Sequence, residues 1–580
     1  MTINGLTEHL ELLTTTHTTR SSSGRGRGSK LELTGIKKLR ELILELAVRG
    51  KLVPQNSDDE PASVLLERIA AEKARLVKEK KIKRQKPLPP VAEDEKPFDL
   101  PAGWEWARLG EIGRDWGQKK PDDDFTYLDV SAIDNSKGKI GSPKVLSANE
   151  APSRARKQIA QGTVIYSTVR PYLQNICVVD KLFSPEAIAS TAFAILHPLQ
   201  QMSGEFFALY LRSPVFIRYV ESVQTGIAYP AINDKQFFSG ITPVPPHAEA
   251  FRIMDKVNEL MTHCDQLEQD ETDSITAHQA LVDTMLTTLT DSKNAGELAE
   301  NWSLVAQHFD TLFTTDHSIE QLKQTILQLA VMGRLVPQDA SDEPASVLLE
   351  RIATEKARLV KEKKIKRQKP LPAITDEEKP FELPEGWEWC RVWDIAELIT
   401  SGSRGWAQHY SEEGAIFVTM GNLSRGSYDL RMNTVRYVTP PENSEGARTK
   451  LIANDLLISI TGDVGNLGLI PEGFGDAYIN QHTCLLRFMP ECQNLFFPEV
   501  MRSPLARYQF DAPQRGIKNS FRLGDVGEMI IPIPPFTEQK RIVAKIKELM
   551  SLCNTLKSQI HQTQTTQQQL SSALVEQALA

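Results

Sequence analysis

The sequence has few of the features on which secreted, membrane-spanning or metal-dependent proteins rely. Its six cysteines are scattered and form no Cys-x-x-Cys pair, which argues against a zinc site and against a disulfide framework. No continuous apolar run approaches the ~18–20 residues that are needed to cross a membrane. The Thr- and Ser-rich N-terminus lacks the basic and apolar segments of a secretory signal. We therefore expect a cytoplasmic protein with no membrane contact.

Motifs of the common catalytic sites are missing as well. The glycines and arginines of Ser21–Lys30 lack the spacing of a phosphate-binding loop, and this low-complexity segment is expected to be disordered. An amino-methyltransferase would need an Asn/Asp-Pro-Pro-aromatic motif, whereas the nearest match, Ile533–Phe536, has no amide or carboxylate. The charged run Asp94–Lys96 has no partner carboxylate on a strand. We expect no catalytic residue, no metal site and no cofactor bound by this chain.

Net charge gives no sign of a nucleic-acid partner, because the chain of 580 residues carries −8 at neutral pH. Any DNA-binding function must therefore come from the local distribution of residues. At one domain per ~150 residues, the length predicts about four folded units.

An internal repeat organises the chain. Residues Asp59–Pro89 recur without a gap as Asp342–Pro372, and the only difference is that Ala71 is replaced by Thr354. The other similar pairs are the opening segments Leu100–Ile112 and Leu383–Ile395 and the closing segments that begin at Pro243 and Pro532. From within each opening segment to the closing segment run two stretches, roughly 104–242 and 387–531, which barely resemble each other beyond those opening residues.

This layout favours a protein that presents two identical surfaces and two unlike ones. Identical surfaces can bind two copies of one partner about a pseudo-twofold axis. Unlike segments in equivalent places suit a protein that reads two different DNA half-sites. The alternative is a recent duplication whose halves drifted apart, but drift would have eroded the shared blocks as well.

Long helices are expected to follow the closing segments. Pro-Pro ends the preceding strand, and Thr537 with Glu538 offers a cap and a first-turn anion. Apolar residues then recur at the alternating spacing of a coiled-coil seam, at Ile253, Val257, Leu260, Cys264 and Leu267 and at Ile542, Ile546, Leu549, Cys553, Leu556 and Ile560. A helix of ~40 residues would span ~60 Å and could act as a spacer. The shorter amphipathic helices Ile36–Val48 and Ile319–Val331, each followed by a glycine, could pack against it.

Each shared block also predicts a basic helix, Glu67–Lys86 and Glu350–Lys369, with nine Lys or Arg against three Glu. A solvated helix face and a contact to phosphates or a partner are both consistent with this pattern. Because the two copies are the same, this helix cannot distinguish one DNA sequence from another.

The two unlike stretches predict compact α/β domains that are not basic overall, each with a late helix, Glu205–Tyr219 or Pro498–Phe510. Their loops carry hydroxyls, amides, aromatics and cations of the kinds that contact phosphates and base edges. In the first stretch the candidate DNA-binding residues are Lys119, Lys120, Arg154, Arg156, Lys157, Tyr166, Ser167, Thr168, Arg170, Tyr172, Tyr229, Asn233 and Lys235. In the second stretch they are Ser401, Ser403, Arg404, Trp406, Arg425, Thr461, Asp463, Asn466, Asn480, Gln481, His482, Arg515, Lys518, Asn519 and Arg522.

These motifs together resemble a known family. The opening segments, the closing segment from Pro532 and the repeated DEPASVLLERIA block closely resemble the specificity subunit of type I restriction-modification enzymes, in the larger B-type subgroup. The first closing segment departs from the usual Glu-Gln pair, since it has Glu249 and Ala250. The resemblance covers nearly everything after about residue 30.

The resemblance implies α/β domains plus a long α-helical coiled coil. Two globular α/β target-recognition domains would be separated by antiparallel helices, with an internal pseudo-twofold repeat. The implied parts are an N-terminal extension (1–35), a shared repeat (36–103), a first recognition domain (104–246), a central spacer helix (247–318), the second shared repeat (319–386), a second recognition domain (387–535) and a C-terminal spacer helix (536–580).

The resemblance also implies partners. Each recognition domain would bind one half of a split, asymmetric site in double-stranded DNA, and the long helices would fix the distance between the halves. The shared helices would dock two methyltransferase subunits, and two restriction/translocase subunits would complete the complex. S-adenosylmethionine, ATP and Mg²⁺ would belong to those partners. Family DNA contacts in the loop before each closing segment favour Tyr229, Asn233, Lys518, Asn519 and Arg522.

Two other functions stay open from the residues alone. One is a coiled-coil scaffold that binds proteins and has no DNA specificity. The other is a self-sufficient modification enzyme, which would have to bind S-adenosylmethionine by itself and is disfavoured by the missing motifs.

Overall fold

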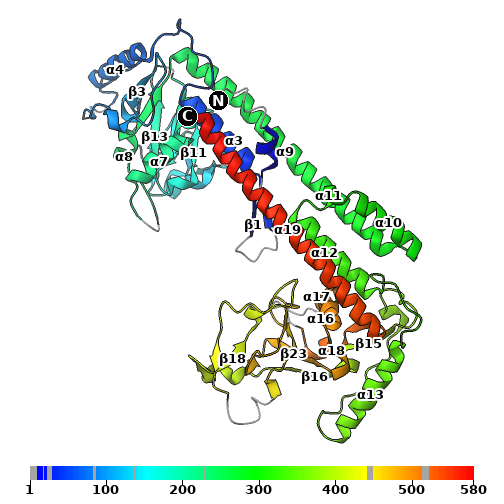
Figure 1. Cartoon of the computed structure of the whole chain (residues 1–580). Coiled ribbons are helices and arrows are strands. Elements are labelled where there is room, and N and C mark those ends of the chain that lie inside the picture. The colour runs from blue at the N-terminus through cyan, green and yellow to red at the C-terminus, as the bar shows by residue number, and fades with distance from the viewer. Residues whose placement is uncertain are drawn as a thin grey trace. The chain divides into compact units, whose positions relative to one another are not determined.

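The computed structural model describes the chain except for residues 1–9, 17, 22–28, 83–85, 116, 136–137, 201, 227–228, 441–447, 513–520 and 580. The chain divides into two compact units, Met1–Ser274 with Thr563–Ala580, and Ile275–Gln562 (Figure 1). Helices α9 (His247–Asp291) and α19 (Phe536–Leu579) each contribute to both units. Within the described residues, the helices are all too short or too polar to cross a membrane.

The first variable stretch, which the resemblance marks as the first recognition domain, is built on two four-stranded sheets, with the strand orders β11-β10-β13-β4 and β8-β5-β12-β9. The strands are β4 (Gly113–Arg114), β5 (Phe125–Leu128), β8 (Lys144–Leu146), β9 (Ala155–Gln158), β10 (Val164–Ser167), β11 (Ile176–Val178), β12 (Ala187–Ser190) and β13 (Phe193–Pro198). All pairs in these sheets are antiparallel except β5 with β12. Every residue of β10 is buried, as the apolar composition of this strand dictates.

The second recognition domain also has two four-stranded sheets, with the orders β16-β23-β20-β21 and β17-β19-β18-β22. Its strands are β16 (Ala396–Ser401), β17 (Tyr410–Ser411), β18 (Ala415–Val418), β19 (Tyr437–Val438), β20 (Leu456–Ser459), β21 (Leu467–Leu469), β22 (Ala477–Ile479) and β23 (Thr483–Phe488). Its parallel pair is β18 with β22. Although their sequences barely resemble each other, the two domains share this construction from helices and mainly antiparallel strands.

The late helix of each recognition domain is two helices rather than the expected one. In the first domain α6 (Gly204–Arg212) is followed by α7 (Pro214–Val223), and in the second α16 (Phe496–Met501) is followed by α17 (Pro504–Asp511). Proline cannot continue a helix, but it fits the first turn of a new one. Ser213 and Ser503 precede these prolines and cap the second helices. Short helices α8 (Asp234–Ser239) and α18 (Leu523–Glu528) come before the closing segments.

The opening and closing segments of each domain are hydrogen-bonded to each other. β3 (Glu105–Arg108) pairs antiparallel with β14 (Ile241–Val244), and β15 (Glu388–Arg391) pairs in the same way with β24 (Ile530–Ile533). α5 (Leu109–Ile112) and α14 (Val392–Ile395) follow the opening strands. The chain enters and leaves each domain on adjacent strands, so the residues in between can differ without disturbing these strands. We call the shared blocks together with the paired opening and closing segments the framework.

The framework around these strand pairs contains the same buried contacts twice. In one, Glu249 accepts hydrogen bonds from Trp104 Nε1 at 3.1 Å and Gln55 Nε2 at 2.8 Å. In the other, Glu538 accepts from Trp387 Nε1 at 3.0 Å and Gln338 Nε2 at 3.1 Å. Burial raises the pKa of both carboxyls, and these hydrogen bonds partly oppose it.

The start of α19 differs from the expected cap. The helix begins at Phe536, so Thr537 lies inside its first turn and does not cap it. Glu538 remains a first-turn anion, but its carboxylate also receives the buried Trp387 and Gln338 donors. This position therefore joins the helix to the opening segment of the domain.

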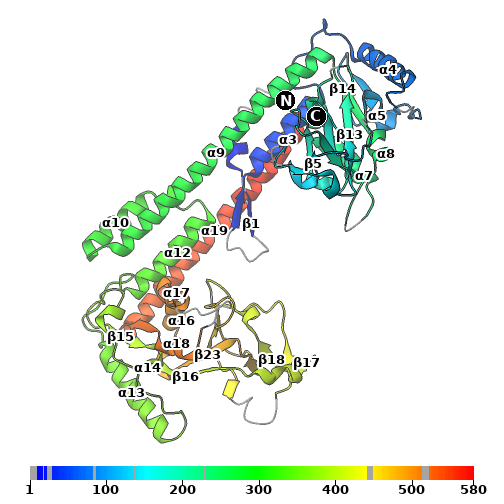
Figure 2. The same cartoon turned by 180° about the vertical axis from the view of Figure 1, so that it is seen from behind.

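In the first unit the short helix α3 (Thr34–Val48) contacts both long helices (Figures 1 and 2). Arg40 pairs with Asp265 and Glu268 of α9 at 2.8 and 2.7 Å. Lys38 Nζ donates to Ser572 Oγ of α19 at 2.5 Å. Gly50, with φ of 65°, ends the helical segment as expected. The N-terminal extension contributes α2 (Leu10–Thr15) and the hairpin β1 (Thr18–Ser21) with β2 (Ser29–Glu32), and residues 22–28 of the low-complexity segment lie outside the described residues.

In the second unit α12 (Asp316–Val331) has the corresponding place. Glu320 pairs with Lys557 of α19 at 2.8 Å, and Arg334, just beyond α12, donates to the carbonyl of Thr290 in α9 at 2.9 Å. Ile326, Ile546 and Cys553 lie in the same buried cluster. The seam residues predicted from their spacing thus pack against a short helix within each unit.

The central segment 247–318 is not one continuous helix. α9 ends at Asp291 and is followed by α10 (Ala295–Gln307) and α11 (Phe309–Leu312). α9 has 45 residues and α19 has 44, so each spans about 65 Å at 1.5 Å per residue. Asn294 caps α10, which explains why a new helix starts there.

The basic helices end earlier than expected. α4 spans Ala62–Lys78 and α13 spans Ala345–Lys361, whereas the predictions ran on to 86 and 369. Lys80 and Lys363 take positive φ values of 56° and 59°. In the second copy Lys364 N then donates back to Leu359 O at 2.9 Å, a hydrogen bond that closes the end of a helix. The cations from Lys363 to Lys369 therefore follow the helix rather than form one of its faces.

Candidate DNA interface

Several loops of the first recognition domain are joined by backbone hydrogen bonds at one end of its sheets. The joining bonds run from Lys119 N to Arg156 O, from Thr191 N to Arg154 O, and from Arg170 N to Pro230 O, each 2.8 Å long. Thr168 N also donates to Ala192 O at 2.8 Å, which links the loop beside Arg154 to the loop of Arg170. The candidates near residues 119, 154, 170 and 229 therefore lie on a chain of linked loops, although they are far apart in the sequence. Backbone hydrogen bonds fix the spacing between loops, so a surface built in this way can present its side chains in a defined pattern.

Most candidates on these loops are open to solvent. Tyr172 and Tyr229 are 60% and 68% exposed, and the guanidinium of Arg170 lies 5.0 Å from the centre of the Tyr229 ring. Lys119 is paired with Glu186 at 2.9 Å and Asp122 at 3.0 Å. The other exposed or half-exposed candidates are Lys120, Arg154, Arg156, Asn233 and Lys235. Asn233 Oδ1 also accepts from Gln236 N and caps α8.

Three consecutive candidates of this domain, Tyr166, Ser167 and Thr168, are buried, which corrects their expected role. Tyr166 packs against Phe216 and Phe237, and Ser167 Oγ donates to Val169 O at 2.8 Å. Thr168 Oγ1 donates to Ala192 O at 2.9 Å. Strand β10 and the residue after it hold these side chains in the core, so they support the loop from below and do not face a ligand.

Lys157 is also buried, and it connects two of the loops. Its side chain is 3% exposed, and its Nζ lies 3.0 Å from Asp115 Oδ2 and 2.6 Å from Asp234 Oδ2. Burial alone would lower the pKa of Lys157, but the hydrogen bond to Asp234 and the charges of both aspartates raise it above its ordinary value. Lys157 is therefore a cation with two internal partners, not a free contact for phosphate as the sequence suggested.

The loops of the second recognition domain meet in a similar way. Gly402 N donates to Asn480 O at 3.1 Å, and Ile460 N donates to His482 O at 3.0 Å. A Cβ at Gly402 would lie 2.0 Å from the carbonyl oxygen of Ile479, so only glycine allows these loops to approach so closely. Gly402 lies between the candidates Ser401 and Ser403, and this close contact is a structural reason for a glycine at that position.

Polar side chains of this second surface form a short network. Thr461 Oγ1 lies 2.8 Å from His482 Nδ1, and Gln481 Nε2 lies 2.9 Å from His482 Nε2. Arg425 pairs with Asp463 at 2.8 Å. The remaining half-exposed or exposed candidates are Ser401, Ser403, Arg404, Asn480 and Arg522. Amides, hydroxyls and a guanidinium of this kind supply both donors and acceptors to base edges.

Two candidates of the second domain are buried. Trp406 packs between Phe417 and Tyr478 in a separate small core. Asn466 is buried and donates to Asp463 Oδ2 at 3.1 Å. Both are corrected to internal roles. Arg515, Lys518 and Asn519 lie outside the described residues.

Two residues of the first surface were not predicted from the sequence. Val169 and Leu173 lie in the same loop as Arg170 and Tyr172, and each is 38% exposed. Apolar side chains are usually found in the core, so nothing in the sequence distinguished these two from core residues.

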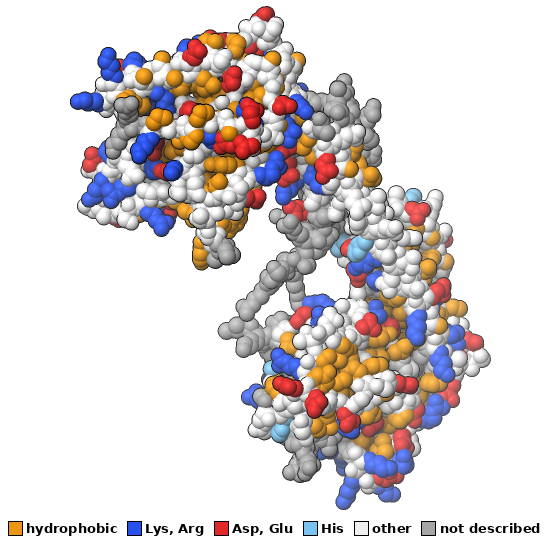
Figure 3. Space-filling view, turned by 60° about the vertical axis from the view of Figure 1, so that its left-hand side comes forward, with side chains coloured by type: hydrophobic (Ala, Val, Ile, Leu, Met, Phe, Trp, Pro, Cys, Tyr) orange, Lys and Arg blue, Asp and Glu red, His pale blue; other side chains and the backbone are white. Residues whose placement is uncertain are grey.

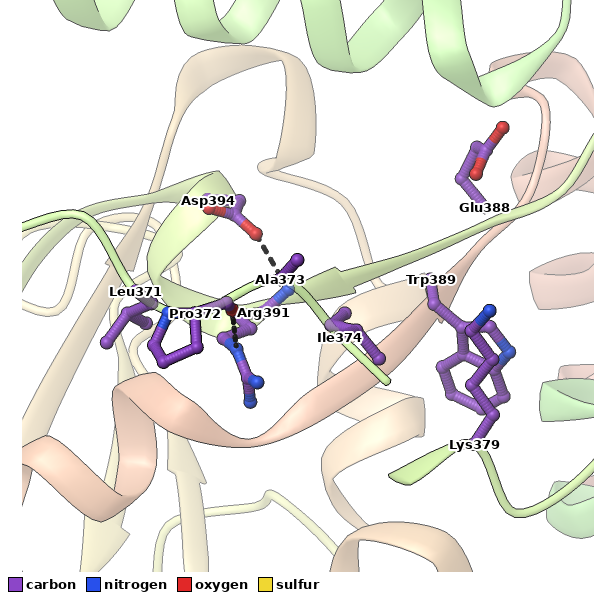
Figure 4. A pocket seen from close by; sticks show the side chains of 9 residues that line it. All are labelled: Leu371, Pro372, Ala373, Ile374, Lys379, Glu388, Trp389, Arg391 and Asp394. Atoms are coloured by element: carbon purple, nitrogen blue, oxygen red, sulfur yellow. Dashed lines mark hydrogen bonds between the residues drawn. The ribbon is translucent and has the colours of Figure 1, made fainter. Parts of the chain in front are cut away.

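Charges of both signs are interspersed over the face of the molecule shown in Figure 3. A pocket of about 410 Å³ lies instead in the framework, beside the opening strand of the second domain (Figure 4). Among its lining residues, Arg391 pairs with Glu378 at 3.0 Å and Lys379 pairs with Asp376 at 2.7 Å. These charged groups are satisfied internally, and the pocket belongs to the duplicated framework rather than to the unlike loops.

Within the described part of the chain, no group of three or more His, Cys, Asp or Glu residues is placed to hold a metal ion. The six cysteines are all buried. The side chains of the two loop surfaces can form hydrogen bonds and ion pairs with a ligand. These interactions serve binding rather than catalysis.

Comparison with known proteins places these features in a family. A family model described as the type I restriction modification DNA specificity domain matches residues 384–563. The chain is 40% identical to the type I restriction enzyme EcoAI specificity subunit and 38% identical to the EcoEI specificity subunit, both from Escherichia coli. Each match covers 99% of this chain and 99% of the relative. The HsdS subunit from Thermoanaerobacter tengcongensis, known from a crystal structure, is 23% identical and covers 84% of this chain and 98% of its own, with a TM-score of 0.42.

The chain therefore belongs to the specificity subunits of type I restriction enzymes. Membership confirms the resemblance seen in the repeated segments. It also confirms the expectation that the chain is a non-catalytic subunit of a modification and restriction complex.

Proposed function

We propose that the chain recognises a DNA sequence in two separated halves, one with each recognition domain. The observation that carries the proposal is that two unlike sets of polar loops stand on one duplicated framework. The same strand pairing and the same Trp–Glu hydrogen bond close both domains. Because the two frameworks are alike, they would hold the two sets of loops in equivalent positions. Because the loops differ, they offer different hydrogen-bond donors and acceptors, so the two domains would read different bases.

The long helices α9 and α19 would set the distance between the two halves. Each contributes to both units and packs against a short helix in each, α3 or α12. A packed helix resists bending, so a change in its length is transmitted to its ends. The coiled-coil packing and pseudo-twofold arrangement expected from the sequence are part of this proposal.

The duplicated surfaces would dock two methyltransferase subunits, with two restriction/translocase subunits joining them. α13 is anchored by buried Leu348 and Ile352, while Lys361, Lys363 and Arg367 at and beyond its end are exposed. Two nearly identical blocks offer the same contacts to two identical partners. In this proposal S-adenosylmethionine, ATP and Mg²⁺ stay with those partners, and the complex works in the cytoplasm.

The test is to map methylated positions in the genome of a host that carries this chain with its methyltransferase subunits and has no other modification system. The proposal predicts one motif with two specified halves and an unspecified spacer of fixed length. A single uninterrupted motif, or methylation that does not depend on this chain, would contradict it.

A scaffold without DNA specificity is the second candidate. Many charged side chains of the framework pair with each other, which is consistent with a surface that does not bind phosphates. It predicts equal affinity of the assembled complex for DNA with and without the mapped motif. A competition binding measurement at fixed salt separates the two functions, because phosphate contacts alone are blind to sequence.

A further inference from the structure

The hairpin loop between β10 and β11 presents apolar side chains to solvent on the polar surface of the first domain. We call residues 168–174 the tip loop. Within it Tyr172 is 60% exposed, and Val169 and Leu173 are each 38% exposed. Tyr229, which lies against Arg170, adds a further exposed ring. Neighbouring apolar groups that remain in water on a binding surface usually mark the place where a partner covers them.

The tip loop is held in one conformation. Pro171 is buried, and Arg170 N donates to Pro230 O at 2.8 Å. Leu173 O accepts from Asn135 Nδ2 at 2.9 Å, and Ser167 N donates to Asn175 O at 3.0 Å. With its core side pinned in this way, the loop presents the Tyr172 and Leu173 side chains on a rigid base. A rigid apolar projection loses little conformational entropy when it is covered.

The backbone of the tip loop is strained where a relaxed loop would use glycine. Arg170 and Gln174 have φ values of 50° and 51°, in the left-handed region that side chains other than glycine rarely adopt. Such strain in a well-anchored loop is characteristic of functional sites.

The second domain provides an internal comparison. Its β20–β21 loop has the same place in the sheet, because β20 pairs with β21 and β23 as β10 pairs with β11 and β13. There the positive φ values of 73° and 83° fall on Gly462 and Gly465, and Val464 is buried. The exposed apolar tip is therefore a feature of the first domain, not a requirement of the hairpin.

The surroundings of the tip loop point to a nucleic-acid ligand. Ile232 N donates to Thr168 O at 2.9 Å, which ties the segment that carries the exposed Lys235 to the tip loop. Thr168 N donates to Ala192 O, and the adjacent Thr191 N donates to Arg154 O, so the exposed Arg154 is one loop further away. The exposed Lys120 follows Lys119, whose N donates to Arg156 O. Cations around an apolar projection match the chemistry of a duplex, which has phosphates on the outside and apolar base faces inside. Proteins that deform DNA insert such apolar wedges between base pairs while basic residues hold the backbone.

Building on the proposed function, we propose that Tyr172 and Leu173 form a wedge that enters the first half-site and unstacks one base step. Part of the sequence preference of this domain is then read through the ease of deforming that step, not through hydrogen bonds to base edges. The second domain, with a buried Val464 and flexible glycines, would read its half-site without such a wedge.

The test uses the chain assembled with its methyltransferase subunits and a duplex that contains the mapped motif. 2-Aminopurine replaces single bases of the first half-site in turn, omitting the methylated base, because methyltransferases flip that base by themselves. The proposal predicts a rise in fluorescence on binding at one step with the unsubstituted complex. In the double variant Tyr172→Ser/Leu173→Ser the rise is lost, and affinity for the motif falls about 10-fold or more.

Leu182→Ala is the matched control, since Leu182 is 80% exposed in the same domain and follows the opposite end of β11. It should leave fluorescence and affinity unchanged, and all variants should keep the melting temperature and the affinity for unrelated DNA. Fluorescence that rises equally in the double variant, or unchanged affinity for the motif, would overturn the wedge. In that case a two-part methylation motif would still leave the proposed function standing.

Discussion

Lys157 shows how a charged side chain can serve recognition without touching a ligand. Its two aspartate partners lie in the loop before Lys119 and at the start of α8, so one buried ammonium holds both loops that flank the candidate surface. Removing it leaves two carboxylates close together in a partly dry site. Breaking a buried pair in this way costs more than the pair contributes.

We therefore predict that Lys157→Met lowers the free energy of unfolding of the first recognition domain by about 1–3 kcal/mol, less than for a fully buried pair because Asp115 and Asp234 are 23% and 46% exposed. The matched change at an exposed site, Lys120→Met, should alter it by less than about 0.5 kcal/mol. Denaturant unfolding of both variants measures the difference. Equal stability of the two would show that Lys157 is not bound to Asp115 and Asp234 in solution.

The buried carboxyl of Glu538 should make the free energy of unfolding depend on pH. Its folded-state pKa is raised above the ordinary value of 4.5, so the folded chain holds this proton more tightly than the unfolded chain does. Its contribution to stability is complete below pH 4.5 and is lost as the pH rises through the raised pKa. Glu538→Gln, which stays neutral, should make the unfolding free energy fall less between pH 4.5 and pH 7.

Thermal unfolding over that pH range gives the comparison, with Glu548→Gln as a control at an exposed position of the same helix. The control should follow the unsubstituted chain. An unchanged slope in Glu538→Gln would mean that the carboxyl is not buried against Trp387.

Residue roles were the hardest part to predict. Lys157, Tyr166 and Trp406 are residue types that often contact DNA, and all three are buried here. Their burial depends on partners distant in the sequence, such as Asp234 for Lys157 and Phe417 for Trp406. No local pattern contains that information. The polar network of Thr461, Gln481 and His482 was identified from composition, but its geometry was not.

At the scale of elements, sequence patterns were more informative. The apolar spacing of α9 and α19 and the glycines after α3 and α12 predicted helices that the structure contains. The break between α6 and α7 follows from a Ser-Pro pair visible in the sequence. The early end of α4 does not, because Lys80 adopts a left-handed conformation that usually signals glycine.

The spacer helices lead to a prediction at this scale. Inserting four residues near the middle of α9 adds slightly more than one turn, about 6 Å, which corresponds to roughly two base pairs of duplex. The methylation motif should keep both specified halves while the spacer between them lengthens. Genome-wide mapping of methylated sites measures this directly. A spacer of unchanged length would exclude α9 as the element that sets it.

For the whole molecule, the internal repeat was the most informative feature of the sequence. It marked the segments at which each variable stretch opens and closes. The opening strand of each domain pairs with its closing strand, so everything between them is free to vary. What the repeat could not reveal is that the unlike loops of the first domain carry an exposed apolar tip at Tyr172 and Leu173.

The most direct measurement exchanges residues 104–242 for the corresponding residues of a relative with a different specificity and maps the methylated sites. The exchanged segment contains β3 and the first two residues of β14, so the relative's own opening strand must pair with the retained Pro243 and Val244 for the domain to be closed in the same way. If each domain reads one half-site, one half of the motif changes to the relative's half, while the other half and the spacer stay the same. If both halves change, or neither does, the division of DNA recognition between two independent domains is wrong.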